Sequence, residues 1–224
     1  MPRDGYQAEL DDLRAGVLDL GETVADQLES GVDAVDRGDD GLARSVVDRD
    51  AAVNDRYLDL EQDCIDLFAL QQPVAGDLRF VASSFKILTD IERIGDLAAN
   101  LGGYALDADP DRFPGVDVRG IGSAVLAQVE AALGAYASAD ADACRDVAAR
   151  DDEVDAVCGR ATERVVRELI EREGTAGPWT VERLIDDVSR ALLVVRDLER
   201  VGDHAVNVAA RTLYVVETDP ELIY

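Results

Sequence analysis

The sequence predicts an all-α protein built from two tandem three-helix bundles, six long helices in all. Apolar residues recur at spacings of three and four in every long segment, as they do along one face of a helix. Strand signals are absent, because aromatic residues are few and no alternation of apolar and polar residues is sustained. The same polar motifs occur in both halves of the chain, which indicates a duplicated unit.

Glycine and proline mark the boundaries in the first half. The run from Arg37 to Gly41 separates the first two helices, and we expect Asp40 to cap the second. Pro73 stands where a helix accepts proline, in its first turn. The predicted helices of this half span residues 4–37, 41–71 and 73–106.

The second half repeats the pattern. Its predicted helices span residues 117–138, 140–173 and 179–217. The stretch before them holds two prolines and predicts a linker. We therefore expect a first bundle over residues 1–108, a linker over 109–116 and a second bundle over 117–224.

Two offsets describe the duplication. A shift of 107 lays residues 90–96 onto 197–203, and also Asn100 onto Asn207. A shift of 101 lays residues 49–54 onto 150–155. The difference corresponds to a change of loop length between the second and third helices. Each repeat therefore carries the same two polar motifs on the same two helices.

The composition is strongly acidic. Asp and Glu number 48 against 22 Lys and Arg, the formal net charge is -26, and Lys86 is the single lysine. Such a surface repels phosphate backbones, so we expect no direct contact with nucleic acid. The Asp-rich, Lys-poor balance resembles cytoplasmic proteins of halophiles, and we interpret it as a solvated acidic coat rather than a partner-binding surface.

Several features favour a cytoplasmic location. The three cysteines lack any CxxC spacing, so neither a disulfide framework nor a zinc site is expected. No apolar stretch approaches the roughly 20 residues that span a bilayer. The first residues also lack the apolar core of a secretory signal.

The repeated motifs place carboxylates on apolar faces. On a helical wheel, Glu92 and Asp96 continue the stripe that begins at Leu78, Val81 and Phe85. The other motif residues fall on similar stripes, and we expect all of them to face the bundle interior. They are Asp50, Asn54, Asp151, Asp155, Glu199 and Asp203.

Buried carboxylates need a compensating cation, because burial of an unpaired negative charge is costly. One source is arginine, at Arg49, Arg93, Arg150 and Arg200, in a network of salt bridges. The other is a metal ion held between the second and third helices of each repeat. Oxygen ligands favour Mg, Mn, Ca or Fe over structural zinc.

Other residues carry weaker signals. His204, the single histidine, is interpreted as a surface or partly packed residue, and Trp179 as a packing residue at a helix start. Gly95 and Gly202 lie inside helices and indicate a close approach of helices beside the acids. No nucleophile or phosphate-loop motif occurs, so we predict no catalytic residue and no organic cofactor.

Four segments resemble the PhoU family of phosphate-uptake regulators. They are residues 9–24 (ELDDLRAGVLDLGETV), 70–79 (LQQPVAGDLR), 86–96 (KILTDIERIGD) and 197–207 (DLERVGDHAVN). The resemblance covers nearly the whole chain, in the same order and the same two-repeat layout.

The resemblance implies a non-enzymatic, cytoplasmic negative regulator of phosphate uptake. Such proteins contact the ATPase of a phosphate ABC transporter and, in bacteria, a sensor kinase, and they are often homodimers. Some bind iron or other metals through paired E/DxxxD motifs, and Fe, Mn, Mg, Ca and Zn remain open for this chain. Asn54 departs from the pattern by replacing an acid. The metal ligands that the resemblance carries over are Asp50, Asn54, Glu92, Asp96, Asp151, Asp155, Glu199 and Asp203.

Two alternatives stay open. A carboxylate-bridged di-metal enzyme of ferritin-like type explains clustered acids, but it expects Glu-x-x-His motifs. A metal-free helical scaffold would pair the acids with Arg93 and Arg200.

Overall fold

The computed structural model describes residues 3–71, 75–107, 116–173 and 178–223. Six helices and no strand occur in these ranges, which confirms the all-α prediction. The described residues include no helix long and apolar enough to cross a membrane. The helices are α1 (Arg3–Arg37), α2 (Asp40–Gln71), α3 (Ala75–Leu106), α4 (Val118–Ser138), α5 (Ala141–Glu173) and α6 (Pro178–Glu217).

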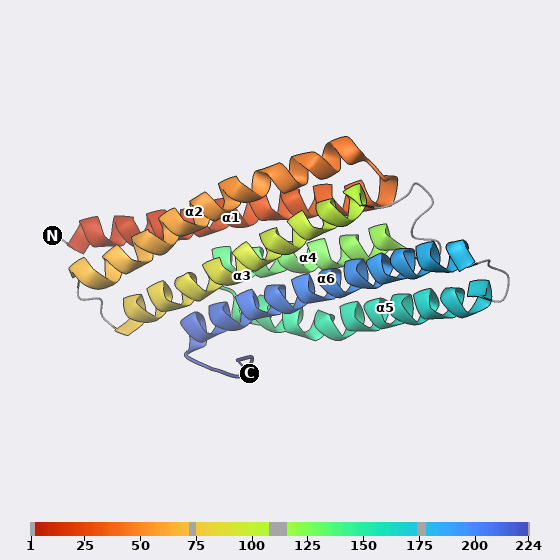
Figure 1. Ribbon diagram of the computed structural model, residues 1–224. Coiled ribbons are helices and arrows are strands. Elements are labelled where there is room, and N and C mark those ends of the chain that lie inside the picture. The colour runs from red at the N-terminus through yellow and green to blue at the C-terminus, as the bar shows by residue number, and fades with distance from the viewer. Residues whose placement is uncertain (1–2, 72–74, 108–115, 174–177, 224) are drawn as a thin grey trace.

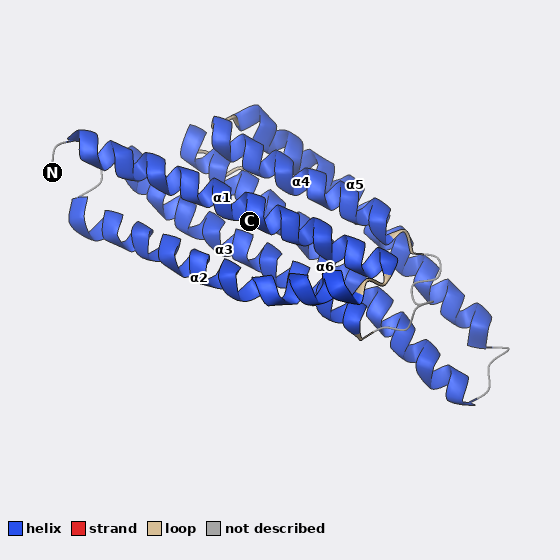
Figure 2. Ribbon diagram, turned by 90° about the horizontal axis from the view of Figure 1, so that it is seen from above, coloured by secondary structure: helices blue, strands red, loops and turns tan. Residues whose placement is uncertain are grey.

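The helices form two bundles that lie side by side. α1, α2 and α3 pack on one another, and α4, α5 and α6 do the same. The bundles meet where α3 packs on α6 and α1 on α4, so that α2 and α5 lie on the outside (Figure 1, Figure 2). Each outer helix therefore contacts the central helix of its own bundle, α2 with α3 and α5 with α6.

One hydrophobic core runs through both bundles. Leu13, Leu20 and Leu28 on α1 are almost fully buried, as are Ile91 and Leu198 on the two central helices. Because α3 and α6 are covered by neighbours on several sides, they bury more of their circumference than the outer helices do.

The contact between α1 and α4 is reciprocal. A Cβ added to Gly21 would stand 2.5 Å from Leu133, and one added to Gly122 would stand 2.5 Å from Val32. Gly122 and Leu133 follow Gly21 and Val32 by the same 101 residues (21 to 122, 32 to 133). Each repeat therefore supplies the glycine against which the other packs, as expected for two units related by a twofold rotation.

The helix boundaries differ little from prediction, but one cap is wrong. Asp39 Oδ1, not Asp40, accepts hydrogen bonds from the backbone N–H groups of Gly41 and Leu42. Asp40 is already helical and pairs with Arg44 instead. Gly38, with φ at +62°, turns the chain early enough for Asp39 to take the capping position.

Some predictions fall outside the described residues. Pro73 lies there, and so does the linker predicted over residues 109–116, apart from Val116. The side chain of Trp179 is likewise not described. The domain boundaries assigned from the sequence stay a prediction.

Candidate metal-binding sites

The eight predicted ligands lie on two matching pairs of helices. Within each repeat, the carboxylates of one helix raise the pKa of carboxylates on the other, which places them close together. The first cluster is defined as Asp50 and Asn54 on α2 with Glu92 and Asp96 on α3. The second cluster is defined as Asp151 and Asp155 on α5 with Glu199 and Asp203 on α6.

The first cluster is half-buried and partly neutralised. Burial and then Asp96 raise the pKa of Asp50, whereas Asn54 opposes this by donating from Nδ2 to Asp50 Oδ2 at 3.1 Å. Burial and then Asp96 also raise the pKa of Glu92. Burial makes the larger contribution to the raised pKa values, and repulsion between the carboxylates adds to it.

Among the described residues, Arg93 is the arginine that forms ion pairs with the first cluster. Its Nη1 lies 3.3 Å from Asp96 Oδ2, and its Nε lies 3.7 Å from Glu92 Oε2. The arginine is more exposed than either acid. Because surface pairs of this kind contribute little, Arg93 compensates the cluster only in part.

The second cluster carries one more negative charge and lies closer to solvent. Burial and then Asp155, Asp203 and Asp151 raise the pKa of Glu199. Burial and then Asp151 and Asp155 raise the pKa of Asp203. The mutual repulsion therefore involves all four acids.

The second cluster has no arginine in a close ion pair among the described residues, although the charge of Arg200 lowers the pKa of Asp203 against the larger effect of burial and the neighbouring acids. Within the described ranges, Arg200 and Arg150 form no ion pair with any of its acids, and Arg49 forms none with the first cluster. Gln128 instead donates from Nε2 to Asp151 Oδ1 at 3.0 Å. The salt-bridge alternative raised by the sequence thus has direct ion pairs in the first repeat, and in the second only the longer-range charge of Arg200.

The expectation that every motif residue faces the bundle interior is wrong for three of the eight, and the other five are only partly buried. Glu92 and Asp96 are half-buried, while Asp155, Glu199 and Asp203 are exposed. Leu78, the reference for the stripe on α3, is itself 45% exposed. The face of α3 that α1, α2 and α6 cover is centred on Ile87, Ile91 and Ile94, so the acids lie beside the core, along the seam with α2.

The ligand atoms of both clusters are of the kind that a hard cation prefers, but their arrangement would not hold one. All eight residues offer oxygen, which suits Mg²⁺, Mn²⁺ or Ca²⁺. Asp50 Oδ1 is buried without a hydrogen-bond partner, as expected of an atom that would accept a cation. In the described part of the chain, however, no three His, Cys, Asp or Glu side chains converge in a geometry that could hold an ion. Binding would therefore require the carboxylates to rotate toward one another.

The cysteine beside the second cluster is not poised as a ligand. Burial and then Glu199 and Asp155 raise the pKa of Cys158 to about 12. The thiol therefore stays protonated at neutral pH, and only a thiolate binds metal well. This agrees with an oxygen-ligand site.

His204 bonds across the two repeats and not to an acid of its own cluster. Its Nδ1 lies 2.8 Å from Asp90 Oδ1, and Asn207 Nδ2 donates to the same oxygen at 3.1 Å. The imidazole ring is partly packed, which is one of the two environments expected from the sequence. A ferritin-like site would need this imidazole turned to the metal.

The matching contact involves Asp197, to which the sequence assigned no role of its own. Asp197 is fully buried and accepts hydrogen bonds from Arg196 at 2.7 Å, from Tyr104 at 2.9 Å and from Asn100 at 3.5 Å. Asp90 and Asn207 thus mirror Asp197 and Asn100 across the seam between α3 and α6. The 107-residue offset pairs these residues (90 with 197, 100 with 207), so the signal was present in the sequence.

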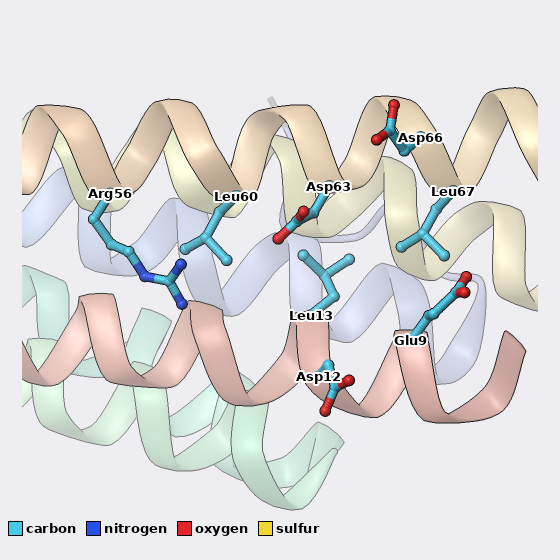
Figure 3. Close-up of a pocket in the computed structure, with 8 residues that line it drawn as sticks. All are labelled: Glu9, Asp12, Leu13, Arg56, Leu60, Asp63, Asp66 and Leu67. Atoms are coloured by element: carbon cyan, nitrogen blue, oxygen red, sulfur yellow. The ribbon is translucent and has the colours of Figure 1, made fainter. Parts of the chain in front are cut away.

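A separate pocket of about 400 Å³ lies between α1 and α2, away from the predicted ligands. Figure 3 shows Arg56 at one end and the Asp63 carboxylate between the two helices, whereas the Asp66 carboxylate points away from α1. Arg164 and Arg167 occupy the corresponding positions of the second repeat, 101 residues later (63 to 164, 66 to 167). Because the charges are reversed between the repeats, this pocket is not the duplicated site.

Fold and site together define a class, that of helical proteins with two repeated three-helix bundles and one carboxylate cluster in each. The family model for the PhoU domain matches residues 17–105 and again residues 118–212. These matches cover most of the chain, once in each repeat. The chain belongs to the PhoU family.

Curated relatives and solved structures agree with this assignment. A phosphate-specific transport system accessory protein PhoU homolog of Pseudomonas aeruginosa is 36% identical, over 94% of this chain and 85% of its own length. One from Clostridium acetobutylicum is 26% identical, over 96% of both chains.

The crystal structure of PhoU from Pseudomonas aeruginosa superposes with a TM-score of 0.86 at 34% identity, over 96% of this chain and 100% of the other. PhoU from Streptococcus pneumoniae, at 24% identity and a TM-score of 0.84 over 96% of this chain and 98% of the other, shares the fold.

Proposed function

We propose that this chain is a cytoplasmic negative regulator of phosphate uptake that acts through contacts with other proteins. The observation that carries the proposal is the match along both repeats to relatives named as accessory proteins of the phosphate-specific transport system. The partners would be the ATPase subunit of a phosphate ABC transporter and a sensor kinase or similar signalling protein. A homodimer is the expected form.

The proposal includes one cation site in each repeat. Two carboxylate clusters at equivalent places, each with raised pKa values, support it. A bound divalent cation supplies positive charge where the acids repel one another. The carboxylates themselves would hold α2 to α3 and α5 to α6, and so set the shape of the surface offered to a partner.

Two observations weigh against an enzyme of ferritin-like type. His204, which such a site would recruit, bonds to Asp90 across the repeats. Neither cluster contains a Glu-x-x-His motif. Peroxide-dependent oxidation by iron-loaded protein would nevertheless be a direct reason to prefer that reading.

Deleting the gene tests the regulatory role. We expect phosphate uptake, or phosphate-responsive expression, to stay high in phosphate-replete cells, because the negative regulator is missing. Complementation with the parent gene should restore repression. Uptake and expression that match the parent strain in both replete and starved cells would contradict the proposal.

A binding assay tests the partner directly. Purified protein should be retained by the immobilised ATPase subunit of the cognate phosphate transporter and not by the ATPase of an unrelated ABC transporter. Sedimentation of the same preparation should give twice the mass of one chain. Equal retention by both ATPases would argue against a specific contact.

A further inference from the structure

Each repeat buries one glutamine beneath its acidic cluster. Gln27 lies on α1 and Gln128 on α4, 101 residues later (27 to 128), and their exposed fractions are 0% and 2%. Both donate from Nε2 to a backbone carbonyl oxygen, that of Val46 at 3.1 Å and that of Val147 at 3.5 Å. Val46 and Val147 lie on α2 and α5, one turn before the first acid of each cluster.

These hydrogen bonds fix the orientation of both amides. A backbone carbonyl only accepts, so the amide nitrogen must face it and the amide oxygen must point away. The second bond of Gln128, from Nε2 to Asp151 Oδ1 at 3.0 Å, requires the same orientation. In both glutamines the oxygen, Oε1, is buried without a hydrogen-bond partner among the described residues.

The unpartnered oxygens lie against the helix turns that carry the acids of α3 and α6. Gln128 Oε1 lies 3.1 Å, and Asp151 Oδ1 3.5 Å, from the point where a Cβ on Gly202 would stand. Gln27 Oε1 lies 3.8 Å from the corresponding point on Gly95. Gly95 and Gly202 directly precede Asp96 and Asp203. The glycines thus leave room for the amide oxygens beside the turns that carry Asp96 and Asp203.

We propose that Gln27 and Gln128 each give their amide oxygen to the cation of their own repeat, as its innermost ligand. The inference rests on the cation sites of the proposed function and adds a ligand from the third helix of each bundle. Neutral carbonyl oxygens are ordinary ligands of hard cations. A cation bound in this way would join all three helices of a bundle.

A purely structural role explains the two amides less well. A side chain kept only for its bond to Val46 or Val147 would leave a buried oxygen unsatisfied, and this is unfavourable wherever it occurs. The same unpartnered atom occurs at equivalent positions of both repeats, beside carboxylates that repel one another. A cation satisfies the amide oxygen and the carboxylates together.

Titration of the full chain with Mn²⁺, followed by calorimetry at pH 8, tests the proposal. Gln128→Met fills the same space without an oxygen, and we expect it to weaken Mn²⁺ binding in the second repeat about tenfold. Gln128→Glu offers a charged oxygen in the same place and should tighten binding by a similar factor. The matching Gln27 variants should do the same for the first repeat.

The Met and Glu variants should change the Mn²⁺ affinity in opposite directions, and this distinguishes a ligand from a packing residue. A structural glutamine would lower the thermal midpoint in both variants while leaving both Mn²⁺ affinities within about twofold of the parent, and this result would overturn the inference. Thr212→Val is the control, because it also removes a buried hydrogen bond, about 13 Å further along α6 than Asp203. Its Mn²⁺ affinity should equal that of the parent.

Two further results decide the remaining cases. Gln128→Asn withdraws the oxygen by one methylene, keeps the amide and should also weaken binding, so it replaces the Met variant if that chain does not fold. A parent chain that binds no Mn²⁺ would overturn the cation sites and this inference with them. A parent that binds Mn²⁺ while Asn and Glu variants bind equally well would overturn the glutamine ligands alone.

Discussion

The two repeats place the same acidic motif in different surroundings. The first cluster is more buried, and there Asn54 replaces one acid while Arg93 pairs with Asp96. The second cluster keeps four acids without an arginine pair among the described residues, and three of them are exposed. Uncompensated charge is therefore kept only where water reaches it, because an ionised group costs much more to bury than to expose.

The difference predicts unequal cation sites. Four carboxylates attract a divalent ion more strongly than three carboxylates and an amide do. In the first repeat Arg93 also competes with the ion for Asp96. We therefore expect the second repeat to bind more tightly, although its residues are less buried.

Removing two ligands from each repeat in turn gives the largest expected effect. Glu199→Ala with Asp203→Ala should lower the affinity of the tighter site by at least about 100-fold. Glu92→Ala with Asp96→Ala should remove only the weaker site and leave helicity unchanged. Mn²⁺ titration with circular dichroism measures both.

A control for net charge belongs with this experiment. Asp26→Ala with Glu29→Ala removes two exposed acids of α1 that lie outside both clusters. It should leave both Mn²⁺ affinities unchanged at moderate salt. If the tighter site disappears with the Glu92 and Asp96 pair instead, the order assigned to the two repeats is reversed.

The contacts between α3 and α6 should also differ in strength. Asp197→Ala removes a fully buried acceptor that Tyr104 Oη and Arg196 both contact, so it should cost about 2–3 kcal/mol of unfolding free energy. Asp90→Ala breaks the more exposed counterpart and should cost about 1 kcal/mol. Urea denaturation measures both, and equal losses would show that burial does not set the difference.

Exchanging the residue that distinguishes the motifs sharpens the comparison. Asn54→Asp gives the first cluster its fourth acid and should raise its Mn²⁺ affinity about tenfold, or about 1.4 kcal/mol. It should also destabilise the metal-free protein, because Asp50 loses the hydrogen bond from Asn54 and gains a like charge. Asp155→Asn should have the reverse effects in the second repeat. Affinities that do not respond would remove Asn54 and Asp155 from the ligand sets.

The smallest effect concerns pH. The folded-state pKa values of Asp155, Glu199 and Asp203 lie above the ordinary values of 3.8 for Asp and 4.5 for Glu. The stability that protonation of these groups contributes is therefore fully present below those ordinary values and is lost as the pH rises through the raised ones. Between about pH 7 and pH 4, the thermal midpoint of metal-free parent should gain about 1–2 °C relative to Asp155→Asn with Asp203→Asn. Parallel midpoint curves for parent and variant would contradict the raised pKa values.

Much of the fold could be predicted because its signals are local. Helix periodicity, the caps and the 101- and 107-residue offsets are properties of neighbouring or repeated residues, and six helices with nearly the predicted bounds are observed. The grouping of the acids into one cluster per repeat followed from the same offsets. The misplaced cap at Asp40 arose because two adjacent aspartates offer the same signal, and the turn at Gly38 selects between them.

The tertiary structure alone decided which way the carboxylates face. A helical wheel shows which residues share a side, but not where neighbouring helices cover that side, and α3 is covered by three of them. For the same reason the sequence did not indicate the roles of Gln27, Gln128 and Asp197, because these depend on partners up to 97 residues away. Local and repeated signals in the sequence were enough to predict the helices, their duplication and the paired acids. Packing determined that the acids line two seams beside the core, because the covered faces of α3 and α6 are set by contacts between the repeats.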